Sequence, residues 1–179
     1  MTTTTTLSEL TGDYVIDAAR TRIGFVARAA LVSKVRGRFD DFEGTAHLDG
    51  DDPSRSGVGL VIRAGSIATG TDKCDDHLRS GDFLDVEEHP TITFASTEVA
   101  RLDGTRFRVT GDLTVHGVTA PATVQFELTG AGSDPRGDFR VGFRGSAVIS
   151  RRDWGVSWGR FLIADKVALE FEVAATRRP

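Results

Sequence analysis

Four histidines and one cysteine are the side chains of this sequence best suited to metal binding or acid–base chemistry: His47, His77, His89, His116 and Cys74. Zinc motifs usually place paired histidines or cysteines about two to five residues apart. No two of these histidines are that close in the sequence, and one cysteine cannot supply a second thiolate. The spacing therefore predicts neither a metal site nor a cofactor.

His77 is the best candidate for a general base, because Asp75 and Asp76 precede it and a carboxylate can orient an imidazole ring. The same pattern is typical of a histidine that only hydrogen-bonds within a helix. No Gly-x-Ser-x-Gly motif and no glycine-rich phosphate loop occur in the sequence. We therefore expect a protein that is not an enzyme. If it does act on an apolar substrate, His77, Asp75 and Asp153 are the first catalytic candidates.

A segment rich in arginine and tryptophan runs from residue 150 to residue 165 and reads SRRDWGVSWGRFLIAD. Arginines and the N-terminal end of a helix suit a pyrophosphate group, whereas Trp154 and Trp158 suit a quinone ring or a cover over an apolar chain. The arginines are Arg151, Arg152 and Arg160. The structural alternative is that Arg152 pairs with Asp153 while the tryptophans close one end of the fold.

Alternating apolar and polar residues fill most of the remaining sequence, as expected for strands with one buried face. The clearest runs are 35–39, 58–64, 107–115, 122–128, 139–145 and 167–173. Asp49-Gly50, Asp103-Gly104 and His116-Gly117 separate such runs and are typical of turns with positive φ between antiparallel strands. One short helix is expected near residues 73–80, with Asp72 as N-cap and Gly81 at its end. This all-β pattern fits a closed up-and-down barrel or a sandwich.

Several short motifs occur together in the order found in one protein family. They are Thr69-Gly70, the Asp-x-His-Leu of 75–78, His89-Pro90 followed by Phe94 and Ser96-Thr97, the GDLTVHGVTAP of 111–121, and the Arg-Asp-Trp-Gly of 152–155. With the helix, they resemble the YceI-like family over residues 13–176. The resemblance favours a single lipocalin-like, antiparallel up-and-down barrel of about eight strands.

The resemblance implies a hydrophobic pore that binds, carries or stores a long-chain polyisoprenoid lipid, either a prenyl pyrophosphate or an isoprenoid quinone, without catalysis. Inward-facing Gly37, Gly111 and Gly145 omit side chains from rows that otherwise carry large ones. The alternative is a barrel filled by side chains, acting as a structural or stress-related interaction module. The residues expected to bind the ligand are Phe25, Phe39, Phe42, Leu60, Ile62, His77, Leu78, Phe83, Phe94, Leu113, Phe126, Phe143, Arg152, Asp153, Trp154, Trp158 and Phe171.

Composition limits the remaining function classes. The 179 residues suffice for one self-supporting domain at 13–176, and residues 1–12 are expected to form a disordered leader. The net charge of −4, with scattered basic residues, argues against a nucleic-acid partner. No signal sequence and no long apolar run are apparent, so we expect a cytoplasmic protein that touches a membrane peripherally. The resemblance also implies a homodimer.

Overall fold

The computed structural model describes residues 6–29, 33–159 and 162–179, and most of its regular secondary structure is β-strand. The strands are β1 (Gly12–Ile16), β2 (Arg22–Ala29), β3 (Ser33–Phe39), β4 (Phe42–Leu48), β5 (Gly57–Arg63), β6 (Ile67–Ala68), β7 (Thr91–Asp103), β8 (Arg106–Val115), β9 (Val118–Ser133), β10 (Phe139–Ser150) and β11 (Lys166–Arg177). The α-helix is α1 (Asp72–Arg79), and the 3-10 helices are η1 (Leu7–Leu10), η2 (Ala18–Arg20), η3 (Pro53–Arg55), η4 (Ala64–Ser66) and η5 (Arg151–Trp154).

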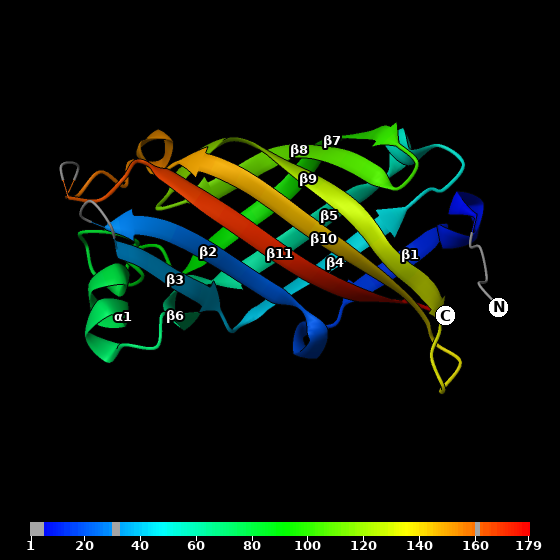
Figure 1. Ribbon diagram of the computed structural model, residues 1–179, viewed down its shortest axis with the longest axis horizontal. Helices are drawn as coiled ribbons and strands as arrows, with labels where there is room; N and C mark the ends of the chain where they lie inside the picture. The colour runs from blue at the N-terminus through cyan, green and yellow to red at the C-terminus, as the bar shows by residue number, and fades with distance from the viewer. Residues whose placement is uncertain (1–5, 30–32, 160–161) are drawn as a thin grey trace.

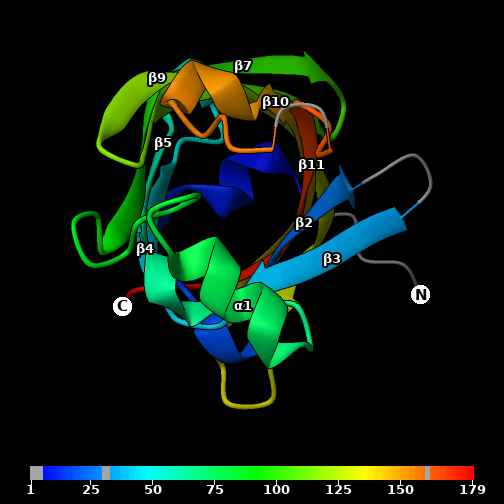
Figure 2. The ribbon, with the colours of Figure 1, turned by 90° about the vertical axis from the view of Figure 1, so that its left-hand side faces the viewer.

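Eight strands close a barrel in the order β1, β4, β5, β7, β8, β9, β10 and β11, and β11 pairs again with β1. Every pairing is antiparallel, so the prediction of a closed antiparallel barrel is confirmed. β2 pairs with β11, β3 pairs with β2, and β6 pairs with β3. These three strands extend the barrel wall toward the end that carries α1 (Figures 1 and 2). η1, near the start of the described chain, and the C-terminus lie at the opposite end (Figure 1).

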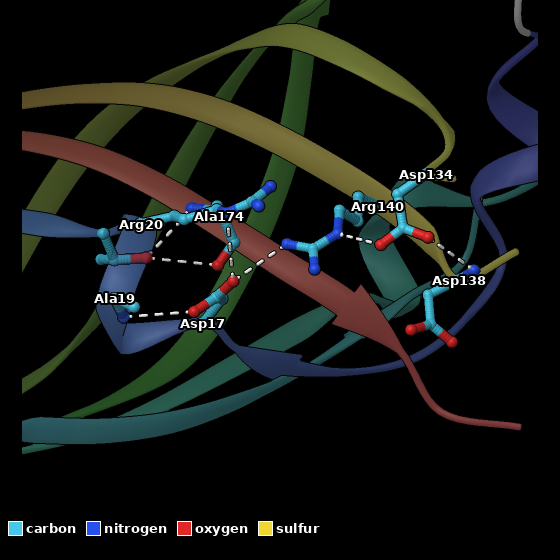
Figure 3. A network of polar contacts seen from close by, with 8 residues as sticks. Asp17, Ala19, Arg20, Asp134, Asp138, Arg140 and Ala174 are labelled. Atoms are coloured by element: carbon cyan, nitrogen blue, oxygen red, sulfur yellow. Dashed lines mark hydrogen bonds and ion pairs between the residues drawn. The ribbon is translucent and has the colours of Figure 1, made fainter. Parts of the chain in front are cut away.

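A break separates β1 from β2, although both pair with the same edge of β11. Asp17 begins the break, and its amide donates to the carbonyl of Ala174 at 2.8 Å. The hydroxyl of Thr21 ends it by bonding both the amide and the carbonyl of Ala174. Arg140 of β10 bridges Asp17 at 2.9 Å and Asp134 at 2.7 Å (Figure 3), and this contact holds the pKa of Asp134 below its usual value. The broken strand is thereby fastened to the barrel wall.

The helix lies where the sequence predicts it, but its ends differ from the prediction. Asp72 is the first helical residue and Thr71 takes the N-cap position, so Asp72 as N-cap is wrong. The helix stops before Gly81, at a cap residue in extended conformation. Asp75 is buried and accepts hydrogen bonds from the Thr69 amide at 2.7 Å and hydroxyl at 2.6 Å. Those bonds hold the pKa of Asp75 below its usual value and tie the helix to the end of β6.

One of the three expected turns has the predicted backbone. His116 and Gly117 adopt φ values of 55° and 72°, as a tight two-residue hairpin requires. Gly104 does join neighbouring strands but without positive φ, and the pairing of these strands shifts register between Arg101 and Asp103, just before the turn. Gly50 belongs to a longer connection that contains η3, where no tight turn is needed.

The buried core falls into two clusters, one toward each end of the barrel. The cluster at the α1 end contains Ile23, Phe42, Ile62, Ala64, Ile92, Leu113, Ala122 and Trp154. The other contains Leu10, Tyr14, Val141 and Ala175. Leu10 belongs to η1, and residues 1–5 of the expected leader lie outside the described residues. Among the described residues, no helix is long and apolar enough to cross a membrane.

Candidate functional site

A cavity of about 490 Å³ occupies the barrel interior. Its lining extends from Leu10 and Tyr14 at the end with the termini to His77 and Phe83 at the α1 end. Most of the lining side chains are aliphatic or aromatic, which suits a ligand recognised mainly by apolar contact. The alternative of a barrel filled by its own side chains therefore does not describe this structure.

The dimensions of the cavity suit a slender ligand. The 12 residues of β10, at a rise of about 3.3 Å and a tilt of about 40°, span about 30 Å of the barrel axis. The volume of about 490 Å³ is the space open to the centre of a water molecule, so dividing it by this length gives a path about 4.5 Å wide for that centre. Adding a radius of about 1.4 Å on each side gives a free width of about 7 Å. Carbon atoms in contact lie about 4 Å apart, so a lumen about 7 Å wide has room for one hydrocarbon chain and is too narrow for two side by side.

Most residues predicted to contact the ligand do line this cavity. They are Phe25, Phe39, Leu60, Ile62, His77, Leu78, Phe83, Phe94, Leu113, Phe126, Phe143, Trp154 and Phe171. Phe42 is buried in the core cluster at the α1 end and is not part of the lining. Arg152, Asp153 and Trp158 also lie outside it. Contact between the lining residues and a ligand stays a prediction.

Three of the lining phenylalanines lie against glycines of the neighbouring strand. A Cβ added to Gly145 would fall 2.4 Å from the ring of Phe126, and one added to Gly37 would fall 2.4 Å from the ring of Phe25. A Cβ on Gly111 would fall 2.5 Å from the ring of Phe94. The glycines therefore do not open empty space, as the sequence suggested. They let each ring fold back against the wall, which keeps the lumen clear.

An aromatic cluster closes part of the mouth at the α1 end. The ring of His77 lies 4.5 Å from that of Trp158 and 5.0 Å from that of Phe83, both edge-on. The Nε2 atom of His77 also contacts the carboxylate of Asp82 at 2.9 Å. Trp158 is 41% exposed, so it covers the cluster from the solvent side. Helix α1 and the loop after η5 thus meet over the cavity.

Arg151 is buried and lines the cavity at the same mouth. Its guanidinium donates to the carbonyls of Val156 at 3.0 Å, Trp158 at 2.8 Å, Ile163 at 3.1 Å and Ala164 at 3.2 Å. Burial lowers the pKa of this side chain from its usual value. Among the described residues no carboxylate forms an ion pair with it, so its charge is held by carbonyl dipoles. Its evident task is to fold the loop over the mouth.

The neighbouring residues of η5 match the structural alternative only in part. Arg152 pairs with Asp165 at 3.3 Å instead of Asp153, because the chain returns along β11 and brings Asp165 opposite the turn. Trp154 is buried, and its indole N–H donates to the carbonyl of Leu113 at 2.8 Å. Trp154 therefore does close this end of the barrel. Arg160 lies outside the described residues.

Several lining residues could not be identified from alternation. Arg151 stands beside Arg152 in the sequence, and nothing local distinguishes the buried arginine from the exposed one. Cys74 on α1 and Tyr14 on β1 also line the cavity. The amphipathic pattern of 72–79 was the available signal for Cys74, since it lies one turn before Leu78 on the same helix face.

Comparison with known proteins gives one family. The model of the YceI-like domain matches residues 14–175. A UPF0312 protein of Pseudomonas aeruginosa strain LESB58 is 39% identical over 171 residues, which cover 94% of this chain and 89% of that relative. A UPF0312 protein of Pectobacterium atrosepticum is 38% identical over 152 residues, covering 84% of this chain and 79% of the relative.

Solved structures share the fold. BcnA of Burkholderia cenocepacia superposes with a TM-score of 0.81 at 25% identity, covering 90% of this chain and 99% of that one. A polyisoprenoid binding domain from Saccharophagus degradans superposes with a TM-score of 0.72 at 18% identity, covering 92% and 98% of the two chains. At that identity, the second likeness concerns the fold alone.

Proposed function

Because this chain belongs to the YceI-like family, we propose that it binds one long-chain isoprenoid lipid lengthwise in its barrel and carries or stores it without chemical change. The observation that carries the proposal is the apolar cavity of about 490 Å³ lined from one end of the barrel to the other. A polyisoprenoid-binding domain among proteins of this fold supports the same ligand class.

The length of the cavity favours a long chain over an ordinary acyl chain. One leaflet of a bilayer is half of a hydrocarbon core of about 30 Å, so an ordinary lipid tail spans about 15 Å. The barrel axis of about 30 Å is twice that length. Each buried methylene contributes about 0.8 kcal/mol before ordering costs, so a chain that fills the lumen binds tightly without a strong polar anchor.

The mouth at the α1 end favours a neutral ring over a pyrophosphate as the head group. The first turn of α1 contains Asp72 and Asp75, whose negative carboxylates already offset the partial positive charge at the N-terminal end of the helix. Among the described arginines only Arg151 lines the cavity, and it already donates four hydrogen bonds to carbonyls. His77, with its aromatic neighbours, offers faces and edges against which a quinone ring can stack.

The proposal assigns no catalytic role and places the protein in the cytoplasm, collecting its lipid at the membrane surface. Burial of the apolar tail supplies the driving force for uptake. A homodimer is part of the expectation from family resemblance.

Native mass spectrometry of the purified protein, followed by extraction of any bound lipid, tests the proposal. We expect one prenyl-chain lipid per barrel. After delipidation, the protein should take up menaquinone at a ratio of one and bind it more tightly than polyprenyl pyrophosphate of similar chain length. Failure to bind either would refute lipid binding, whereas tighter binding of the pyrophosphate would refute only the head-group assignment.

The single cysteine provides an independent readout of where the lipid lies. Cys74 lines the cavity and is half-buried, so a lipid in the lumen should slow its alkylation. We expect the rate with iodoacetamide to fall on addition of menaquinone and to stay unchanged on addition of a short quinone without a prenyl tail. An equal effect of both compounds would mean that the tail does not enter the barrel.

A further inference from the structure

Three potential metal ligands that are distant in sequence meet at the rim of the barrel. One nitrogen or carboxylate oxygen from each of Asp85, His89 and His116 lies within 4.8 Å of the others. The two imidazole rings are 5.1 Å apart between centroids, with an interplanar angle of 68°. We propose that these three residues form a binding site for a divalent transition-metal ion of the zinc type.

The backbone around the site is built to hold the three side chains close together. The carbonyl of Asp85 accepts the amide of His89 at 2.8 Å, so one turn of chain presents both residues. His116 starts the β8–β9 hairpin turn, and a Cβ on the following Gly117 would lie 2.6 Å from the ring of His89. A glycine at position 117 is therefore required for His89 to reach His116.

Asp85 and His116 are the two non-glycine residues with positive φ in the part of the chain that the structure describes. Their φ values are 49° and 55°. Such conformations cost free energy and persist where the surrounding structure holds them. Both members of this pair point into the same cluster.

The hydrogen bonds of the histidine side chains distinguish His89 and His116 from the other two histidines. His47 contacts the carboxylate of Asp13 at 2.8 Å, and His77 contacts that of Asp82 at 2.9 Å. Within the described residues, no hydrogen bond involves the ring nitrogens of His89 or His116 or the carboxylate of Asp85. Two imidazoles and a carboxylate thus face one another with their lone pairs free for a common partner.

The donor set indicates the class of ion. Imidazole nitrogen suits zinc, iron, cobalt, nickel and copper, whereas magnesium and calcium prefer sites made of oxygen. Three protein ligands leave at least one position on a zinc ion for water or another ligand. Zinc binds imidazole nitrogen at about 2.0–2.1 Å, so the ligand atoms of a tetrahedral site lie about 3.4 Å apart. The three ligand atoms here lie within 4.8 Å of one another, so small side-chain movements would complete the site.

The site is separate from the lipid cavity but adjoins it. Asp85, His89 and His116 are absent from the cavity lining, whereas Leu84 and Val115, which precede two of them, line it. A bound ion would therefore connect the segment after α1 to the β8–β9 hairpin at the mouth. The proposal does not depend on what the lumen binds.

Isothermal titration calorimetry of the full chain with Zn²⁺, after dialysis against a chelator, tests this site. His116→Asn and Asp85→Asn remove ligands while keeping a residue that tolerates positive φ, so both variants should fold. His47→Asn is the matched control, because it removes a histidine outside the cluster. We expect one Zn²⁺ per chain, a loss of affinity of at least 10-fold in each cluster variant, and no change in His47→Asn.

The melting temperature gives a second readout, since an ion that binds the folded state raises it. Zn²⁺ should raise the melting temperature of the unmodified protein and of His47→Asn, and it should not raise that of His116→Asn. Absence of Zn²⁺ binding by the unmodified protein would overturn the proposal. So would an affinity of His116→Asn and Asp85→Asn for Zn²⁺ equal to that of the unmodified protein.

Discussion

Replacing Gly145 by alanine should narrow the lumen while leaving the barrel folded. The Cβ would lie 2.4 Å from Cε1 and 2.6 Å from Cδ1 of Phe126, and its three nearest neighbours all belong to that ring. Carbon atoms need at least about 3.5 Å, so the ring must retreat by about 1 Å. The ring of Phe126 lines the cavity, so we expect the displaced ring to move into the lumen.

The expected magnitudes follow from this displacement. Overpacking of this kind costs about 1–3 kcal/mol of folding free energy. A ring displaced into a tube one chain wide should also remove contacts with one or two methylenes of the lipid. At about 0.8 kcal/mol each, this raises the dissociation constant about 4- to 15-fold.

Gly130→Ala is the matched control, because it lies in the adjacent strand and a Cβ there would meet nothing within 4 Å. Both substitutions reduce the backbone freedom of the unfolded chain by the same amount. The difference between the two variants in free energy of unfolding therefore reports the clash with Phe126 alone. Urea unfolding and menaquinone titration measure the two effects, and Phe126→Leu combined with Gly145→Ala should recover part of the affinity. If Gly145→Ala matches Gly130→Ala in both assays, the ring is not held against the wall as described.

Three further changes test the mouth and the helix. Arg151→Lys should lower the free energy of unfolding by about 2–4 kcal/mol in urea titrations, because an ammonium group cannot reach all four carbonyls that the buried guanidinium serves; an unchanged midpoint would contradict this. Trp158→Ala should speed lipid release about 2- to 13-fold in stopped-flow measurements with little loss of stability, since it removes the aromatic contact with His77. The Asp75 carboxylate has a lowered pKa in the fold, so its bonds with Thr69 stabilise the protein above the usual aspartate value of 3.8 and are lost as pH falls through the lowered value. The stability difference between the unmodified protein and Asp75→Asn should therefore be present at pH 7 and fade below about pH 4, and a difference constant down to pH 2 would count against that role.

Alternation identified most of the cavity lining because a period of two assigns each strand residue to one face. Phe126 and Phe143 both face the lumen, as their positions in apolar rows predict. Phe42 shows the limit of this reasoning, since it packs into the core cluster at the α1 end without lining the cavity, whereas Ile62 of the same cluster does line it. Period alone does not distinguish a core position from a lumen position.

The contacts between strands could not be predicted, because they depend on register. Gly145 lies opposite Phe126, and Gly37 lies opposite Phe25. A shift of one residue in either pairing would put the ring beside a different neighbour. The open lumen thus depends on the register between paired strands as much as on which residues the strands contain. The sequence of either strand alone does not predict it.

The cluster at the rim shows the same limit for chemistry. Spacing rules for metal motifs test ligands that share one helix or one turn, as Asp85 and His89 do. His116 joins them from a hairpin 27 positions after His89, and closure of the barrel brings that hairpin to the segment after α1. In a barrel, every hairpin at one end lies near several others on the rim, so ligands from different hairpins can converge without any signature in the sequence. The absence of a short motif therefore excludes local sites and leaves such rim sites to be found from the fold.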